Sequence, residues 1–100
     1  MRIVVLPQAA DEFEAAVAYY DDKQPRLGPR FRDEVDHYIR WVSEHAEIPP
    51  LRPGGYRRVN LRAFPHCIAY VRLDETIWVL AIAHAHREPE YWIDRTQHIG

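Results

Sequence analysis

The chain has 100 residues, of which 47% are hydrophobic and 28% are charged, and its formal net charge at neutral pH is −2. These values predict one folded domain over residues 1–100 with a modest core, and they exclude a disordered chain. A single cysteine, Cys67, excludes an internal disulfide framework and a zinc site of the CxxC type. Because no apolar run is long enough for a signal peptide or a membrane span, we expect a cytoplasmic protein that does not contact membranes.

Charge is distributed unevenly along the chain. Residues 7–50 contain ten acidic and five basic residues, whereas residues 51–73 contain five arginines and no acid. This asymmetry indicates either an ordinary solvated surface or a basic sheet face that receives an acidic partner or a phosphate. The slightly negative total charge argues against strong non-specific binding of nucleic acid.

The first half of the chain predicts one strand followed by two helices. Residues 2–6 are mostly β-branched, which is typical of a strand. Apolar residues at helical spacing predict helices over residues 9–22 and 29–45, joined by a short turn rich in proline and glycine. Pro29 suits the first turn of the second helix, where its missing N–H costs nothing. The two helices should therefore form a helical hairpin.

The second half predicts three strands and a short tail. Three prolines and two glycines make residues 48–55 a loop, and Asp74-Glu75 marks a tight hairpin between the last two strands. The tail over residues 88–95 is expected to form a helical turn. The expected strands are residues 56–61, 64–73 and 76–84.

These elements predict an α+β fold in the order β-α-α-β-β-β, with a small, mainly antiparallel sheet and the helical hairpin on one face. Residues 64–73 and 76–84 are apolar at both alternating positions, so both faces of the sheet need a cover. The helices supply one cover. The second face requires either the C-terminal tail or a partner chain.

The sequence resembles the ParE/RelE superfamily of toxins from type II toxin–antitoxin systems, in the ParE-like (plasmid stabilisation) branch. The similar segments follow one another in the same order along nearly the whole chain. They are Ala9-x-x-Glu12-x-x-x-Ala16-x-x-Tyr19-Tyr20, then Pro25-x-Leu27-Gly28-x-x-Phe31-x-x-Glu34, then Phe64-Pro65-His66-Cys67-Ile68-Ala69-Tyr70, and finally His84-x-x-Arg87-x-Pro89-x-Tyr91-Trp92 after a last strand. His66 stands where the family commonly has tyrosine.

The resemblance implies a growth-inhibiting toxin that a cognate antitoxin neutralises by wrapping around it. ParE-like members are associated with inhibition of DNA gyrase, whereas RelE-like members cut messenger RNA on the ribosome. A degenerate member would only bind its antitoxin, and DNA would be bound through the antitoxin complex alone. The ParE-like reading is favoured, and whether the chain is an enzyme depends on the branch.

Metal-free RNA cleavage would need a base, cations around the phosphorane and an acid for the leaving oxygen. Lys23 lies in the predicted turn between the helices, away from the sheet, and arginine stays protonated and is a poor base. Histidine titrates near neutrality and could replace it. In a RelE-like chain the candidate catalytic residues are Arg58, Arg62, His84 (or His86), Arg87 and Tyr91.

Antitoxin or target binding has its own candidates among the arginines and the aromatic residues, because exposed aromatic side chains concentrate at interfaces. For each of them a purely structural role is the competing interpretation: arginines protect open sheet edges, Arg87 suits an ion pair, and tryptophans close cores. The candidate binding residues are Trp41, Arg57, Arg58, Arg62, Arg72, Arg87, Tyr91 and Trp92.

No cofactor or metal is expected. His84-x-His86 has a spacing that can hold a metal, but His66 and His98 are candidate third ligands by number alone. Cys67 is interpreted as a small buried hydrophobic residue and not as a nucleophile.

Overall fold

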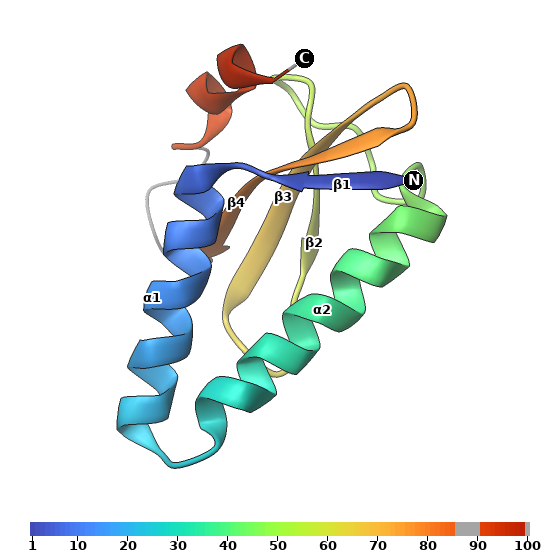
Figure 1. Ribbon diagram of the computed structural model, residues 1–100. Helices are drawn as coiled ribbons and strands as arrows, with labels where there is room; N and C mark the ends of the chain where they lie inside the picture. Colours follow the sequence, from blue (N-terminus) through green and yellow to red (C-terminus); the bar gives the residue numbers. More distant parts are fainter. Residues whose placement is uncertain (86–90, 100) are drawn as a thin grey trace.

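The computed structural model describes residues 1–85 and 91–99, and it has the predicted α+β architecture. Four strands form one sheet, two long helices lie across one face of it, and a short 3₁₀ helix follows the last strand (Figure 1). In chain order the elements are β1 (Arg2–Val5), α1 (Pro7–Lys23), α2 (Leu27–His45), β2 (Arg57–Asn60), β3 (His66–Leu73), β4 (Thr76–His84) and η1 (Ile93–His98).

The sheet has the strand order β1-β4-β3-β2, so the first strand lies beside the last. β1 runs parallel to β4, and the other two pairings are antiparallel. Asp74 and Glu75 form the predicted tight hairpin, where Asp74 takes a left-handed conformation with φ of 53°. Aspartate tolerates that conformation better than most residues.

A β-bulge interrupts the pairing of β3 with β4. Tyr70 lies opposite Val79 while Ala69 lies opposite Ala81, so Leu80 is an extra residue in β4. β1 pairs only with residues 76–79 of β4. The backbone of β4 beyond Val79 therefore has no strand on that side, and its polar groups need other partners.

The two helices meet closely at the start of α2. Gly28 lies in the first helical turn, and a Cβ atom placed on it would be 2.8 Å from the carbonyl oxygen of Val17 and 2.9 Å from Cβ of Asp21. Any larger residue would push α2 away from α1. Pro29 falls in the first turn of α2, as predicted, although the helix begins two residues earlier.

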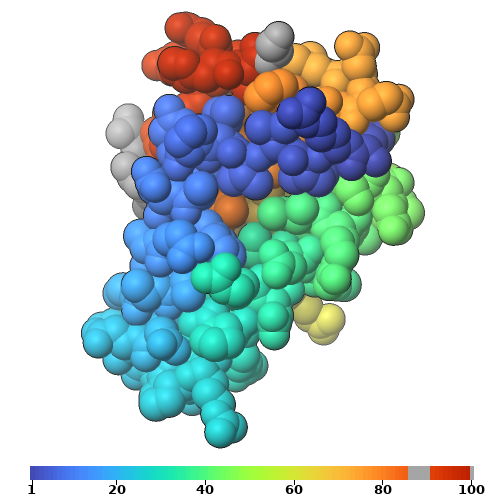
Figure 2. Space-filling view, viewed as in Figure 1, coloured from blue at the N-terminus to red at the C-terminus, as the bar shows by residue number. Residues whose placement is uncertain are grey.

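The helices bury one face of the sheet. α2 contributes the fully buried Phe31, Val35 and Val42, which pack against residues of β3 and β4. Burial of each such side chain contributes about 2 kcal/mol. Figure 2, drawn from this side, shows α1 and α2 lying side by side over the sheet.

The second face of the sheet carries its own apolar cluster, and the C-terminal tail covers part of it. Leu80, Ala83 and Cys67 pack there with Trp92, which is 3% exposed, and with Tyr56. The rings of Tyr56 and Trp92 meet edge to face at 5.7 Å. The chain's own tail thus supplies part of the second cover that the apolar strands require.

The remaining differences from the predicted elements lie at their ends. β2 and β3 are shorter than expected because residues 61–65 form a connection instead of strand. The tail helix covers residues 93–98 and so begins later than predicted, while residues 86–90 lie outside the described part of the chain. Within the described residues, no helix is long and apolar enough to cross a membrane.

Candidate functional site

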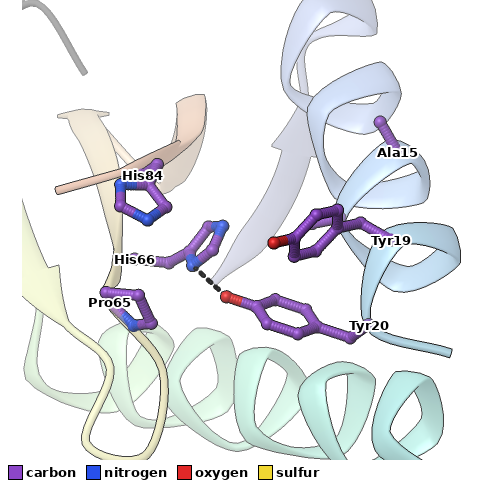
Figure 3. A pocket seen from close by; sticks show the side chains of 7 residues that line it. Ala15, Tyr19, Tyr20, Pro65, His66 and His84 are labelled. Carbon is purple, nitrogen blue, oxygen red and sulfur yellow. Dashed lines mark hydrogen bonds between the residues drawn. The ribbon is translucent and has the colours of Figure 1, made fainter. Parts of the chain in front are cut away.

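A hollow of about 580 Å³ opens between α1 and the adjacent ends of β3 and β4. Tyr19 and Tyr20 of α1 face His66 and His84 across it (Figure 3). Ala15, Ala16 and Pro65 complete its lining. The small side chains of Ala15 and Ala16 leave this corner between α1 and the sheet partly open.

His66 forms the polar floor of this hollow. It pairs with His84 across the two strands, with ring centroids 5.1 Å apart, and its Nδ1 lies 3.4 Å from the hydroxyl of Tyr20. Burial, assisted by the nearby charge of His84, lowers the pKa of His66 from 6.5 to about 4. His66 is therefore neutral at physiological pH.

Glu12 connects α1, the bulged strand and the tail. Its carboxylate accepts hydrogen bonds from the backbone N–H of Ile82 (3.1 Å), from the hydroxyl of Tyr91 and from two nitrogens of Arg95 (3.1 and 3.0 Å). Arg95 also donates to the carbonyl oxygen of Leu80 at 2.9 Å. These bonds satisfy the part of β4 that lacks a neighbouring strand, and they fix the tail against α1.

Tyr91, a candidate acid for RNA cleavage, belongs to this structural group. Its hydroxyl donates to Glu12, and the guanidinium of Arg95 lies 5.1 Å from its ring centroid. A phenol held in this way is oriented by the fold and not directed at an open site.

Two of the candidate binding arginines are held by Glu47 on the loop after α2. Arg57 donates to the carbonyl oxygen of Pro49 at 2.6 Å and to the carboxylate of Glu47 at 2.9 Å. Arg72 donates to the same carboxylate at 2.8 Å and to the backbone oxygen of Asp74 at 3.0 Å. Both guanidinium groups are therefore occupied in anchoring this loop to the sheet.

Arg58 and Arg62 have no such acidic partner within the described residues. Arg62 is exposed in the connection between β2 and β3, whose backbone is held by Glu34 through the N–H groups of Arg62 and Ala63. Arg58 lies on β2 opposite Ala69, and its buried Nε atom has no hydrogen-bond partner there. Arg58 lies on β2 and Arg62 in the connection after it, whereas Tyr91 lies in the tail before η1.

The remaining predicted site residues fall in three places. Trp41 is half-buried at the edge of the helix-side core, with its ring 5.2 Å from that of His45, while Trp92, at the start of the tail, is buried against the second face of the sheet. His84 lines the hollow at the end of β4. Arg87 and His86 lie outside the described residues.

Metal or thiol chemistry finds no support in the described part of the chain. Within residues 1–85 and 91–99, no three His, Cys, Asp or Glu side chains gather closely enough to hold a metal ion. Burial raises the pKa of the Cys67 thiol, although the charges of Arg58 and Arg52 act in the opposite direction. The thiol therefore stays protonated, as the interpretation of Cys67 as a hydrophobic residue requires.

Sequence patterns assign no role to Glu12, although this residue belongs to the first family-like segment, and they do not indicate Glu47 or the hollow beside His66. Glu12 and Arg95 are 83 positions apart, and no local pattern indicates that they meet. One feature of the sequence could have indicated a partner for Glu12: it lies on the inward-facing side of the first helix, where an unpaired carboxylate would be costly.

Comparison with known proteins agrees with the fold. The chromosomal ParDE toxin–antitoxin system of Pseudomonas aeruginosa includes a chain that superposes with a TM-score of 0.60 at 17% sequence identity. The match covers 86% of this chain and 97% of that one. Among curated protein sequences, none is significantly similar to the chain.

The architecture is that of a small α+β module with a helical hairpin on a four-stranded mixed sheet. The sequence profile of the ParE toxins of type II toxin–antitoxin systems, the parDE type, matches residues 3–89. The chain therefore belongs to the ParE toxin family.

Proposed function

We propose that this toxin acts by binding and inhibiting DNA gyrase, and that a cognate antitoxin neutralises it. Membership of the ParE family is the observation that carries the proposal. The similar chain from the P. aeruginosa ParDE system belongs to a toxin–antitoxin pair, which supports an antitoxin partner here as well.

The described side chains favour a binding function over messenger RNA cleavage. Lys23 lies at the end of α1 with its ammonium 5.1 Å from the ring of Tyr19, far along the chain from the sheet arginines. The Tyr91 hydroxyl is bound to Glu12, and two arginines of the sheet are bound to Glu47. The general acid and the free cations that phosphodiester cleavage needs are thus largely engaged elsewhere.

The surfaces left for partners are the second sheet face around Arg58, the exposed Arg62 connection and the hollow between α1 and β4. Trp92 and Tyr91 would support partner binding by holding the tail in place. Trp41 would supply part of the binding surface at the edge of the helical hairpin. Arg87, which lies outside the described residues, remains a proposed contact residue. We propose that these surfaces together bind the antitoxin and gyrase.

Controlled expression in a bacterial host tests the toxin and its neutralisation. Induction of the chain is expected to arrest growth with filamentous cells and an SOS response, since a poisoned gyrase damages DNA. Co-expression of a short protein encoded beside the toxin gene is expected to restore growth. Normal growth at a verified level of folded protein would contradict the proposal.

The same cells separate gyrase inhibition from RNA cleavage. Under the proposal, bulk messenger RNA keeps its normal half-life while the SOS response rises. The double variant Arg87→Ala, Tyr91→Phe is expected to leave RNA decay unchanged, because cleavage is absent already. Fragmented messenger RNA that disappears in the folded double variant would identify a RelE-like nuclease instead.

A further inference from the structure

The hollow between α1 and the ends of β3 and β4 is lined mainly by rings. Tyr19 and Tyr20 face His66 and His84 across it (Figure 3). The ring of Tyr19 is 57% exposed, and the edge-on contact with Tyr20 at 5.2 Å helps to fix its orientation. A volume of about 580 Å³ lies in the range of pockets that bind small molecules. The hollow can therefore receive one long side chain of another protein.

The rings of this lining suit a positively charged occupant. The face of an aromatic ring attracts cations, and the ring of Tyr19 already does so, since the ammonium of Lys23 lies 5.1 Å from its centroid. Lys23 is exposed one helical turn beyond Tyr19 and does not line the hollow itself. His66 is neutral at physiological pH, so the floor of the hollow does not repel a cation.

The charge around the hollow is negative on the side of α1. This helix carries five acidic residues and one lysine. Glu12 and Glu14 have arginine partners. Asp11 and Asp22 are exposed and lie about one helical turn before and after the lining part of the helix, on its outer side. Among the described residues, the lining contains no lysine or arginine, so the potential at the mouth attracts a cation and repels a phosphate.

An arginine side chain fits these features better than a lysine side chain. Its guanidinium is planar, stacks on aromatic faces and is more weakly hydrated than an ammonium, so it loses less on leaving water. Its N–H groups can also donate to a tyrosine hydroxyl at the rim. A nucleic acid fits poorly, because its phosphates would approach the aspartates of α1. The chemistry of the hollow therefore indicates an arginine carried by a protein.

We propose that the hollow binds an arginine side chain of the antitoxin, with the guanidinium against the ring of Tyr19 and with Asp11 and Asp22 attracting its charge. This assignment rests on the proposed toxin–antitoxin function. The antitoxin is chosen over gyrase because the similar chain of known structure comes from a toxin–antitoxin system. The antitoxin segment that carries the arginine crosses the outer side of α1.

The first test titrates the full chain with acetyl-arginine amide and, separately, with acetyl-citrulline amide. Citrulline has nearly the shape of arginine but carries a neutral urea group in place of the guanidinium. NMR follows the ring signals of Tyr19 and His84. We expect both signals to shift and saturate with the arginine compound, and the citrulline compound to bind about threefold to tenfold more weakly.

Variants of the lining separate ring and charge from the fold. Tyr19→Leu removes an exposed ring and should weaken binding of the arginine compound about threefold to fivefold, whereas Tyr19→Phe keeps the ring and should bind normally. Lys23→Gln removes a competing cation and should bind more tightly. Asp22→Asn should weaken binding, and the control Asp33→Asn, which changes an exposed aspartate of α2, should not.

Co-expression links the hollow to the antitoxin. Cells that express Tyr19→Leu should need more antitoxin for normal growth than cells that express the unmodified toxin or Tyr19→Phe. Equal binding of the arginine and citrulline compounds, or unchanged binding by Tyr19→Leu, would overturn the cation site. Rescue of Tyr19→Leu at the same antitoxin level would overturn its assignment to the antitoxin. Binding of the arginine compound by a folded chain that arrests no growth would support the site and contradict the proposed function.

Discussion

His66 gives the clearest effect of a single residue, because its imidazole is buried and neutral. In the unfolded chain its pKa is near 6.5, and in the folded protein burial, with the charge of His84, lowers it to about 4. Below pH 6.5 the unfolded chain therefore binds a proton that the folded chain does not. The free energy of unfolding should fall as the pH drops from 6.5 to 4, by about 3 kcal/mol in total from this residue.

Urea unfolding of the wild type and of His66→Gln between pH 7 and pH 4 measures the contribution of His66. It is the difference between the two curves of unfolding free energy against pH. The variant is expected to lose less stability on acidification, so the curves converge or cross. His37→Gln removes an exposed histidine of α2 and should run parallel to the wild type. Parallel curves for wild type and His66→Gln would show that His66 is protonated equally in both states.

At the scale of elements, the tail depends on the carboxylate of Glu12. The side chains of Glu12 and Arg95 are 15% and 17% exposed and form a bidentate ion pair, with Tyr91 and Ile82 donating to the same carboxylate. Replacing Glu12 with Gln leaves a largely buried guanidinium unpaired. We expect a loss of about 3 kcal/mol in the free energy of unfolding.

Denaturant unfolding combined with hydrogen exchange tests the role of Glu12. Exchange should accelerate first at the amide of Ile82 and in η1. Glu14→Gln is the matched control, because its ion pair with Arg32 is solvent-exposed and should contribute less than about 1 kcal/mol. Equal losses from the two variants would contradict the role assigned to Glu12.

The contact of α1 with α2 depends on Gly28. In an unhindered helix, replacing glycine with alanine stabilises by about 1 kcal/mol. Here the added Cβ would lie within 3 Å of Val17 and Asp21, so Gly28→Ala is expected to destabilise by about 1–3 kcal/mol. Thermal unfolding measures directly whether Gly28→Ala raises or lowers the stability. A raised melting temperature would show that the helices separate without cost.

At the scale of the whole molecule, local patterns predicted the elements and their order. The Asp74-Glu75 hairpin, the first-turn position of Pro29 and the need for a cover on the second sheet face were all visible in the sequence and are confirmed. The later start of the tail helix was missed, since its residues are held by Glu12 and Leu80 and not by a helical pattern of their own.

The candidate sites were less predictable than the fold. The run of arginines between residues 51 and 73 looks uniform in the sequence, but Glu47 holds Arg57 and Arg72 and leaves Arg58 without a carboxylate in the described residues. Which arginines Glu47 holds depends on the position of the loop after α2 and on strand pairing. Both depend on contacts between residues that are far apart in the sequence. Composition therefore indicated a basic sheet face but could not show which arginines remain available.

DNA gyrase is the proposed target of this ParE-family toxin. The most direct test incubates the purified chain with DNA gyrase, ATP and relaxed plasmid, and then scores supercoiled and linear DNA. If the toxin inhibits gyrase, supercoiling is lost or gyrase-dependent linear DNA appears in proportion to the toxin added, and the antitoxin reverses the effect. Full supercoiling activity in the presence of excess folded chain would contradict the proposed target.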